Sequence, residues 1–255
     1  MSDSSSGSRG LPPVPSYDFS LFGPVERRPL SNVRKVVARR MFASWVNLPQ
    51  VTQFDQVDIT DLEALRTRLK AQAEAQAARL TLLAFIVKAA ALALKAFPEF
   101  NASLDESCET LILKKYCHIA FAADTPEGLL APVIKDAGKK SLLDLARDIQ
   151  RLSEKARAGK LAFSDVEGGC FSVSNLGALG GTGFTPVVNA PELAVLGVGR
   201  AAMTVVDRDG KHVSRLMLPV SLTYDHRAID GAAGGRFLKF VCEALASPSG
   251  LADLR

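Results

Sequence analysis

The order of helix-forming and strand-forming segments limits the folds open to this 255-residue chain more than any other feature. Helix patterns dominate its first half, whereas the last third contains short apolar segments typical of strands at 170–174, 193–198 and 216–224. The two kinds of segment are mixed without the regular strand–helix alternation of a Rossmann fold or a TIM barrel. We therefore predict an α/β or α+β sandwich.

Periodic and capping patterns define the expected elements. The first helix carries apolar residues every four positions from Val33 to Trp45. A capping-box pattern, Thr60 to Glu63, begins the second helix, and Ser141 caps the fourth. Helices are thus expected at 31–48, 60–79 and 80–97, from 142 onward and at 232–246, with further strands at 51–59, 111–123 and 129–134 around a turn at 124–128.

Composition excludes several classes of protein. The apolar segment 80–97 is short for a membrane span, and Lys88 and Lys95 lie on one helical face, which predicts a mostly buried helix. A net charge of +4 and 7% aromatic residues, with no basic run interleaved with aromatics, argue against nucleic-acid binding. The four cysteines have no metal-ligand or C-x-x-C spacing, and residues 1–10 lack a secretion signal. We expect a cytoplasmic protein with reduced thiols.

One of the three histidines stands apart from the others. His212 lies in a polar turn and His118 in a strand pattern, so solvated and packed positions explain them. His226 follows an apolar strand, lies between Asp225 and Arg227, and precedes the start of a helix. A strand-end turn of this kind can present a side chain rigidly into a cleft. Spacing alone does not choose between a general base and a turn whose polar residues cap one another.

If His226 is a base, a thiol is the substrate group that suits it. A thiol with a pKa of about 8.5 and an imidazole with a pKa of about 6.5 make proton transfer uphill by roughly 2.7 kcal/mol. That difference is small beside the barriers that enzymes overcome, whereas deprotonation of an alcohol would require more assistance.

A second candidate site is the strand end 171–177 (FSVSNLG), which runs into the glycine-rich segment 178–184. It matches neither a P-loop nor a nucleophile elbow. Ser174 could donate a hydrogen bond to an oxyanion. The residues alone favour an ordinary turn, because Ser-Asn before Gly is common turn chemistry.

A series of segments resembles one enzyme family. Residues 218–231 (LPVSLTYDHRAIDG) are similar to the active-site signature of the dihydrolipoamide acyltransferases, the core components of 2-oxoacid dehydrogenase complexes. Further matching blocks follow in the same order at 18–23, 48–55, 113–116, 124–129, 168–177 and 188–192. The DFS and NAPE blocks are most similar to the bacterial pyruvate-dehydrogenase type, an acetyltransferase.

The resemblance implies a chloramphenicol-acetyltransferase-like two-layer sandwich with a mixed sheet, working as a trimer with active sites between subunits. CoA and dihydrolipoamide would enter the active-site channel from opposite ends. His226 would match the family's general base, and Ser174 would match the hydroxyl that stabilises the oxyanion from a neighbouring subunit. Asp230 would match the residue that orients the site, paired with an arginine of the first helix, for which Arg34, Arg39 and Arg40 are candidates. A thioester is already activated, so no metal is expected.

The remaining expectations concern partners and boundaries. Residues 1–28 read as a flexible linker or arm and 29–255 as the catalytic domain, with no lipoyl or peripheral-subunit-binding domain, so the lipoyl group would come in trans from a lipoyl-bearing partner. Lys155, Arg157 and Lys160 are candidates for the CoA phosphates, although a solvated helix end also explains them. Pro248, Gly250 and the terminal Arg255 predict that assembly stops at the trimer. The alternatives are a catalytically silent core scaffold and an acyltransferase for a non-lipoyl acceptor.

Overall fold

The computed structural model describes residues 14–126 and 128–252, so residues 1–13 of the expected arm, Glu127 of the expected turn and the terminal Arg255 lie outside the described part. The chain divides into two units, the first ending at Ser31 and the second beginning at Asn32. In the first unit a short 3-10 turn, η1 (Phe19–Leu21), is capped by Asp18, whose carboxylate accepts a hydrogen bond from Ser20 N at 3.1 Å.

The second unit is built on a seven-stranded mixed sheet with the order β1-β11-β9-β8-β4-β7, to which β10 is added beside β11. Strand β8 is parallel to β9 and to β4, whereas the other pairs are antiparallel. The strands are β1 (Gln50–Asp58), β4 (Ile119–Phe121), β7 (Val133–Ile134), β8 (Phe171–Asn175), β9 (Ala194–Val198), β10 (Ala202–Arg208) and β11 (Lys211–Asp225). The mixed sheet therefore confirms the expected sheet type.

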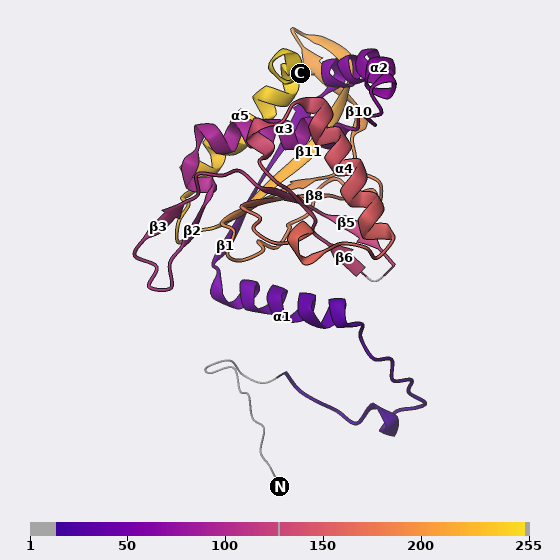
Figure 1. Ribbon diagram of the computed structural model, residues 1–255, viewed down its shortest axis with the longest axis vertical. Helices are drawn as coiled ribbons and strands as arrows, with labels where there is room; N and C mark the ends of the chain where they lie inside the picture. Colours follow the sequence, from indigo (N-terminus) through magenta and orange to yellow (C-terminus); the bar gives the residue numbers. More distant parts are fainter. Residues whose placement is uncertain (1–13, 127, 253–255) are drawn as a thin grey trace. The chain divides into compact units, whose positions relative to one another are not determined.

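Helices α2 (Thr60–Ala75), α3 (Leu82–Ala96), α4 (Leu142–Arg157) and α5 (Gly231–Ala246) supply the helical side of the core (Figure 1). Alternate residues of the inner strands, such as Leu196 on β9 and Leu222 on β11, pack with these helices in one hydrophobic cluster. Helix α3 is buried along most of its length, as its apolar sequence predicted. Within the described residues, no helix is long and apolar enough to cross a membrane.

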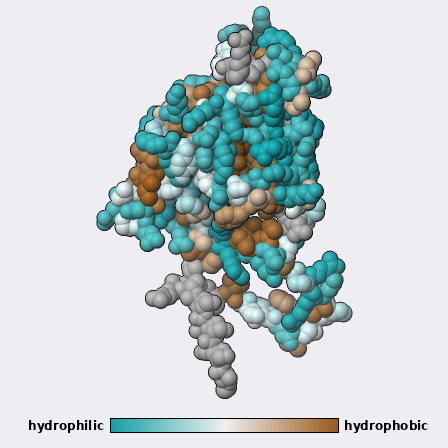
Figure 2. Space-filling view, viewed as in Figure 1, coloured by the Kyte–Doolittle hydropathy of each residue, from teal (hydrophilic) through white to brown (hydrophobic). Residues whose placement is uncertain are grey.

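The opposite face of the sheet is covered differently. The segment 176–192 crosses it, held where Ser221 Oγ donates a hydrogen bond to Phe184 O at 2.8 Å. The end of α1 (Asn32–Asn47) joins this layer, because Ala190 N donates to the buried Ser44 Oγ at 3.2 Å. Of the apolar residues predicted to line one face of α1, Val37 and Trp45 are exposed, Trp45 to 67%, whereas Val33 and Met41 are partly buried. Figure 2 shows apolar patches on a mostly hydrophilic surface. Exposed apolar patches are typical of surfaces that bind another protein.

Several sequence-based predictions of elements were wrong in detail. Helix α2 ends at Ala75 rather than near Arg79, because Ala77 adopts a left-handed φ of 54° that ends the helix. Its capping box does not form: Glu63 pairs with Arg66, and Asp58 accepts the hydrogen bond from Thr60 N instead.

The expected strand at 111–123 is also broken. It divides into β3 (Leu111–Leu113), β4 and β5 (Ala123–Thr125), and β3 and β5 form separate two-stranded ladders with β2 (Ala102–Leu104) and β6 (Gly128–Leu130). Strand β10 was not predicted. It forms a hairpin with β11 through Asp209 and Gly210, both with positive φ, which is the geometry favoured by a tight hairpin turn.

Candidate active site

His226 lies in the turn between β11 and α5. Its backbone N donates a hydrogen bond to Pro49 O at 2.9 Å, which ties the turn to the residue that precedes β1. Its side chain is exposed, and its ring centroid lies 6.0 Å from that of the buried Tyr224. The end of a central strand thus fixes the backbone, while the imidazole remains accessible to a substrate.

A charged pair stabilises this turn. Asp225 is fully buried, and its carboxylate accepts hydrogen bonds from Arg227 Nε at 3.0 Å and from a terminal guanidinium nitrogen at 2.7 Å. Arg227 N also donates to Asp225 Oδ1 at 3.1 Å. Because the guanidinium fork and the backbone N both satisfy the buried carboxylate, the residues on either side of His226 are held in one geometry. The sequence identified these residues only as charged neighbours.

Asp230 caps the helix that follows the turn. Its Oδ1 accepts a hydrogen bond from Ala233 N at 2.7 Å, and this bond is the main reason why the pKa of Asp230 lies below its usual value. His226 is near enough to add a small favourable interaction with the carboxylate. Within the described residues Asp230 makes no ion pair with Arg34, Arg39 or Arg40, the first-helix arginines expected to pair with it.

Ser174 is distinguished by its neighbours on the face of the sheet opposite the core helices. The strand registers place Ser172, Val195, Thr223 and Thr52 in one row, and Ser174, Gly197, Ser221 and Phe54 in the next. Ser172 donates to Glu192, Ser221 donates to Phe184 O, and Thr52 and Thr223 bond to each other. Within the described residues, the partly exposed Ser174 hydroxyl is the one in these two rows without a hydrogen bond. It is therefore available to a ligand.

The chain does not bring Ser174 and His226 together. Ser174 is level with Ser221, two strands away across the sheet, and His226 lies five residues after Ser221, just beyond the end of β11. With about 3.3 Å per residue and about 4.8 Å between strands, the two residues are about 19 Å apart. A single tetrahedral intermediate cannot contact both groups of one chain. Each copy therefore carries two half-sites that are separated in space.

A buried acid near Ser174 was missed by the sequence analysis, which quoted it only within the block 188–192. Glu192 is 2% exposed and accepts a hydrogen bond from Ser172 Oγ at 2.6 Å. Burial raises the pKa of Glu192 to about 7, although the hydrogen bond from Ser172 and the charge of Lys114 partly offset this effect. An acid inside an apolar stretch was the only signal available in the sequence.

The raised pKa of Glu192 predicts a specific pH dependence of stability. Between its ordinary pKa near 4.5 and about 7, the folded state keeps a proton that the unfolded state releases, so this group costs stability as the pH rises. The full cost is on the order of 3 kcal/mol. We expect the free energy of unfolding of Glu192→Gln, relative to wild type, to increase from about pH 5 to about pH 8 in urea titrations. A difference that does not vary with pH would contradict this assignment.

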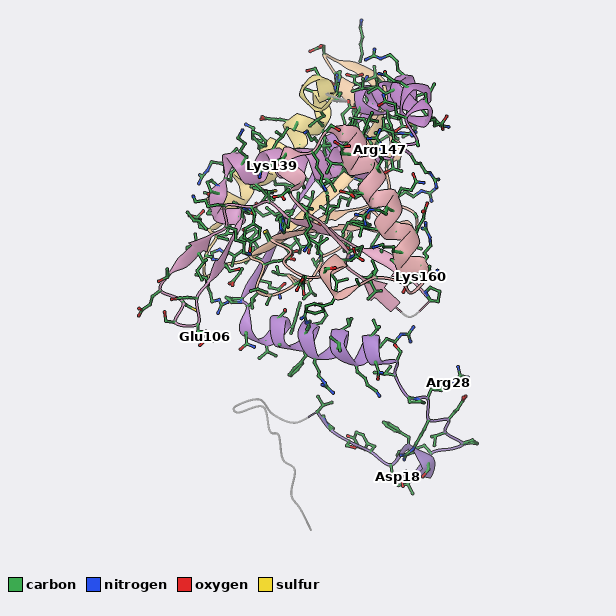
Figure 3. The ribbon with its side chains drawn as sticks, viewed as in Figure 1. Asp18, Arg28, Glu106, Lys139, Arg147 and Lys160 are labelled. Atoms are coloured by element: carbon green, nitrogen blue, oxygen red, sulfur yellow. The ribbon has the colours of Figure 1, made fainter. Side chains whose placement is uncertain are left out.

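The predicted CoA-phosphate cations lie at the end of α4. Lys155 is engaged with Asp165 at 3.0 Å, whereas Arg157 and Lys160 are exposed. Figure 3 shows Lys160 beside the end of α4, on the opposite side of the view from Glu106 of the β2–β3 hairpin. The same hairpin carries Cys108, whose Sγ lies 3.4 Å from an Arg227 guanidinium nitrogen. The structure therefore does not gather these cations beside the His226 turn.

The other histidines occupy positions like those expected for them. His118 is partly buried, and its Nδ1 accepts a hydrogen bond from Asp136 N at 3.0 Å. His212 is exposed near the start of β11. All four cysteines are free thiols, and the described residues contain no group of three or more His, Cys, Asp and Glu residues placed to hold a metal ion.

Comparison with known proteins assigns the chain to a family. The model of the 2-oxoacid dehydrogenases acyltransferase catalytic domain matches residues 22–252. The chain is 54% identical over 241 residues to the dihydrolipoyllysine-residue acetyltransferase component of the pyruvate dehydrogenase complex of Pseudomonas aeruginosa. That match covers 94% of this chain but 44% of the relative, so the chain spans less than half the length of that protein. The chain belongs to the 2-oxoacid dehydrogenase acyltransferase family.

Solved structures agree with this assignment. One comes from a study of the catalytic roles of a serine, a histidine and an asparagine in the Azotobacter vinelandii dihydrolipoamide acetyltransferase. It is 49% identical, has a TM-score of 0.92, and covers 94% of this chain and 99% of that one. A second, with the same identity, TM-score and coverage, is the cubic core of a pyruvate dehydrogenase multienzyme complex. A structure of chloramphenicol acetyltransferase is 15% identical and has a TM-score of 0.52. The match covers 86% of this chain and 98% of the chloramphenicol acetyltransferase chain. This likeness confirms the predicted fold.

Proposed function

We propose that the chain transfers an acyl group, with acetyl as the first candidate, between CoA and dihydrolipoamide. The observation that carries the proposal is the pair of half-sites: an accessible His226 on a rigid turn and, about 19 Å away by the sheet geometry, a Ser174 hydroxyl free to bind a ligand. Joining the histidine of one copy to the serine of another gives a base and an oxyanion donor in one site. Family membership supports the same reaction class.

The proposed reaction is direct transfer between two thiols. His226 removes the proton from the thiol of the acceptor, and the thiolate attacks the carbonyl carbon of the acyl thioester. The Ser174 hydroxyl of a neighbouring copy donates a hydrogen bond to the oxyanion of the tetrahedral intermediate. As the original carbon–sulfur bond breaks, the imidazolium returns its proton to the departing thiolate, so protons balance over the reaction.

The spacing of the residues in the Azotobacter enzyme supports these roles. In that protein the serine lies 52 positions before the histidine, and the asparagine lies four positions after it. Ser174 and Asp230 have the same spacings from His226. Asp230 thus stands where that enzyme has an asparagine. Both side chains carry an oxygen that can cap a helix, so we assign Asp230 the role of orienting the His226 turn.

A transfer assay tests the proposal against its alternatives. Wild-type protein is incubated with acetyl-CoA and free dihydrolipoamide, and formation of free CoA and acetyl-dihydrolipoamide is followed. Transfer that requires the dithiol supports the proposal. No transfer to any thiol would favour a catalytically silent scaffold, and transfer only to another acceptor would favour a non-lipoyl acyltransferase. The residues Lys155, Arg157 and Lys160 remain candidates for the CoA phosphates, tested by the KM for CoA of their alanine variants.

The proposed site requires at least two copies of the chain, and we assign a trimer as the unit. The exposed apolar stripe of α1, which includes Trp45, is a surface available for such contacts. In the complex the trimer would receive acyl groups from a lipoyl-bearing partner and work with the other 2-oxoacid dehydrogenase components. Sedimentation tests whether trimers join further, as in the cubic core of the solved relative. A trimer would agree with the sequence-based hypothesis, and a much larger particle would contradict it.

A further inference from the structure

Glu192 lies at the junction between the two strands that carry the candidate site. Its carboxylate accepts the Ser172 hydroxyl at 2.6 Å, and Ser172 is two residues before Ser174 on the same face of β8. The next residue, Leu193, accepts a hydrogen bond from Asp225 N at 2.9 Å, immediately before His226. The segment 192–193 thus bonds to the serine strand on one side and to the end of the histidine strand on the other.

The fold leaves space for this carboxylate. A Cβ on Gly169 would lie 2.9 Å from Glu192 Oε1, so any other residue there would displace the acid. The backbone of Glu192 is also fixed within its own loop, because Glu192 N donates to Asn189 O at 3.0 Å. Gly169, which precedes β8, and the turn from Asn189 to Glu192 therefore both accommodate a buried acid at position 192.

Glu192 is a buried acid that does not form an ion pair within the described residues. The other buried acid, Asp225, is paired with Arg227, whereas Glu192 has no ion pair within the described residues. The charged and titratable groups that act on it are Lys114, on the segment after β3, and nearby Cys170, before β8. Lys114 itself donates to Ala102 O at 3.2 Å. A buried acid without a counter-ion is costly to stability, so Glu192 is not explained by packing alone.

We propose that Glu192 is a positioning residue for the oxyanion donor: it binds Ser172 near the start of β8 and thereby fixes the strand that carries Ser174. The proposal rests on the proposed transfer reaction. Ser172 and Ser174 are separated by about 7 Å, two residues of strand, so Glu192 acts on Ser174 through the strand rather than by contact. Small displacements of a catalytic group lower the rate of reaction far more than the affinity for substrate.

The test is a double-mutant cycle between Glu192 and Ser174. Glu192→Ala is expected to lower kcat by about tenfold while the KM values for CoA and dihydrolipoamide stay within about twofold. In the Ser174→Ala background the same change is expected to alter kcat by less than about twofold, because the group that it positions has been removed. Glu192→Gln, whose amide oxygen can still accept from Ser172, should keep kcat within about threefold of wild type.

Two further variants keep the test decisive. Ser103→Ala removes a hydrogen bond of 2.5 Å to Pro191 O in the same loop without touching Ser172, and should leave kcat unchanged. If Glu192→Ala does not fold, Ser172→Ala replaces it in the cycle, with the same expected loss. Equal losses in the two backgrounds, or wild-type kcat in folded Glu192→Ala or Ser172→Ala, would overturn the inference. An inactive wild type would instead reject the proposed function.

Discussion

Replacing His226 with alanine is expected to lower the rate of acyl transfer by about three orders of magnitude. The imidazole is the proposed base, and positioned general bases contribute roughly 10²- to 10⁴-fold to rates. Because the side chain is exposed, the loss should come without a large change in stability. The measurement is kcat with acetyl-CoA and dihydrolipoamide near neutral pH, together with a thermal unfolding curve.

His212→Ala is the matched control for this variant. It removes an exposed histidine near the start of β11, whereas His226 follows the end of the same strand. We expect wild-type kcat for this control. Substantial activity in folded His226→Ala would remove the histidine from the mechanism, and a loss in both variants would indicate a general effect on the protein. The role of the base should also show in a higher pH optimum for the residual activity, where the thiol ionises by itself.

Replacing Ser174 with alanine is expected to lower kcat by about 10²-fold to 10³-fold, the usual effect of removing one oxyanion donor. Its hydroxyl makes no hydrogen bond within the described chain, so its loss should not destabilise the fold. The KM values should change little, because the donor acts on the tetrahedral intermediate rather than on the bound thioester. The comparison is with Ser221→Ala, a hydroxyl in the same row that is bonded to Phe184 O.

Ser221→Ala should lose stability rather than catalytic rate, because it removes the hydrogen bond from the buried Ser221 hydroxyl to Phe184 O. If Ser174→Ala keeps wild-type kcat, the hydroxyl is not the oxyanion donor. If the two serine variants show the same kinetic loss, the polar face of the sheet acts as a structural layer, and no single hydroxyl can be assigned to the reaction.

The sequence predicted local features well where a local rule decides them. Ser141 caps α4 as expected, since Asp144 N donates to its hydroxyl at 3.1 Å, and the apolar pattern of α3 correctly predicted its burial. Predictions failed where tertiary contacts decide the outcome. Thr60 and Glu63 match a capping box, yet Asp58 and Arg66 offer better-placed partners in the folded chain. A local sequence pattern does not show that other residues compete for the hydrogen bonds of Thr60 and Glu63.

The sequence singled out candidate site residues but did not specify their geometry. His226 and Ser174 stood out through position and resemblance, whereas their separation follows from the register of β8, β9 and β11. The paired hydrogen bonds from the Arg227 guanidinium to Asp225 depend on the burial of the aspartate, which a strand pattern does not specify. Glu192 is similar: its partner Ser172 lies 20 positions away, and only the crossing loop brings them together.

Activity of mixed assemblies tests the central claim, that one active site uses His226 from one copy and Ser174 from another. His226→Ala and Ser174→Ala chains are co-expressed in equal amounts with different tags, and assemblies that contain both are purified. In a trimer that contains both variants, one of the three sites pairs an intact histidine with an intact serine, so we expect about a third of wild-type kcat from two nearly inactive variants. Mixed assemblies no more active than either variant alone would show that each chain holds a complete site, and would contradict the account.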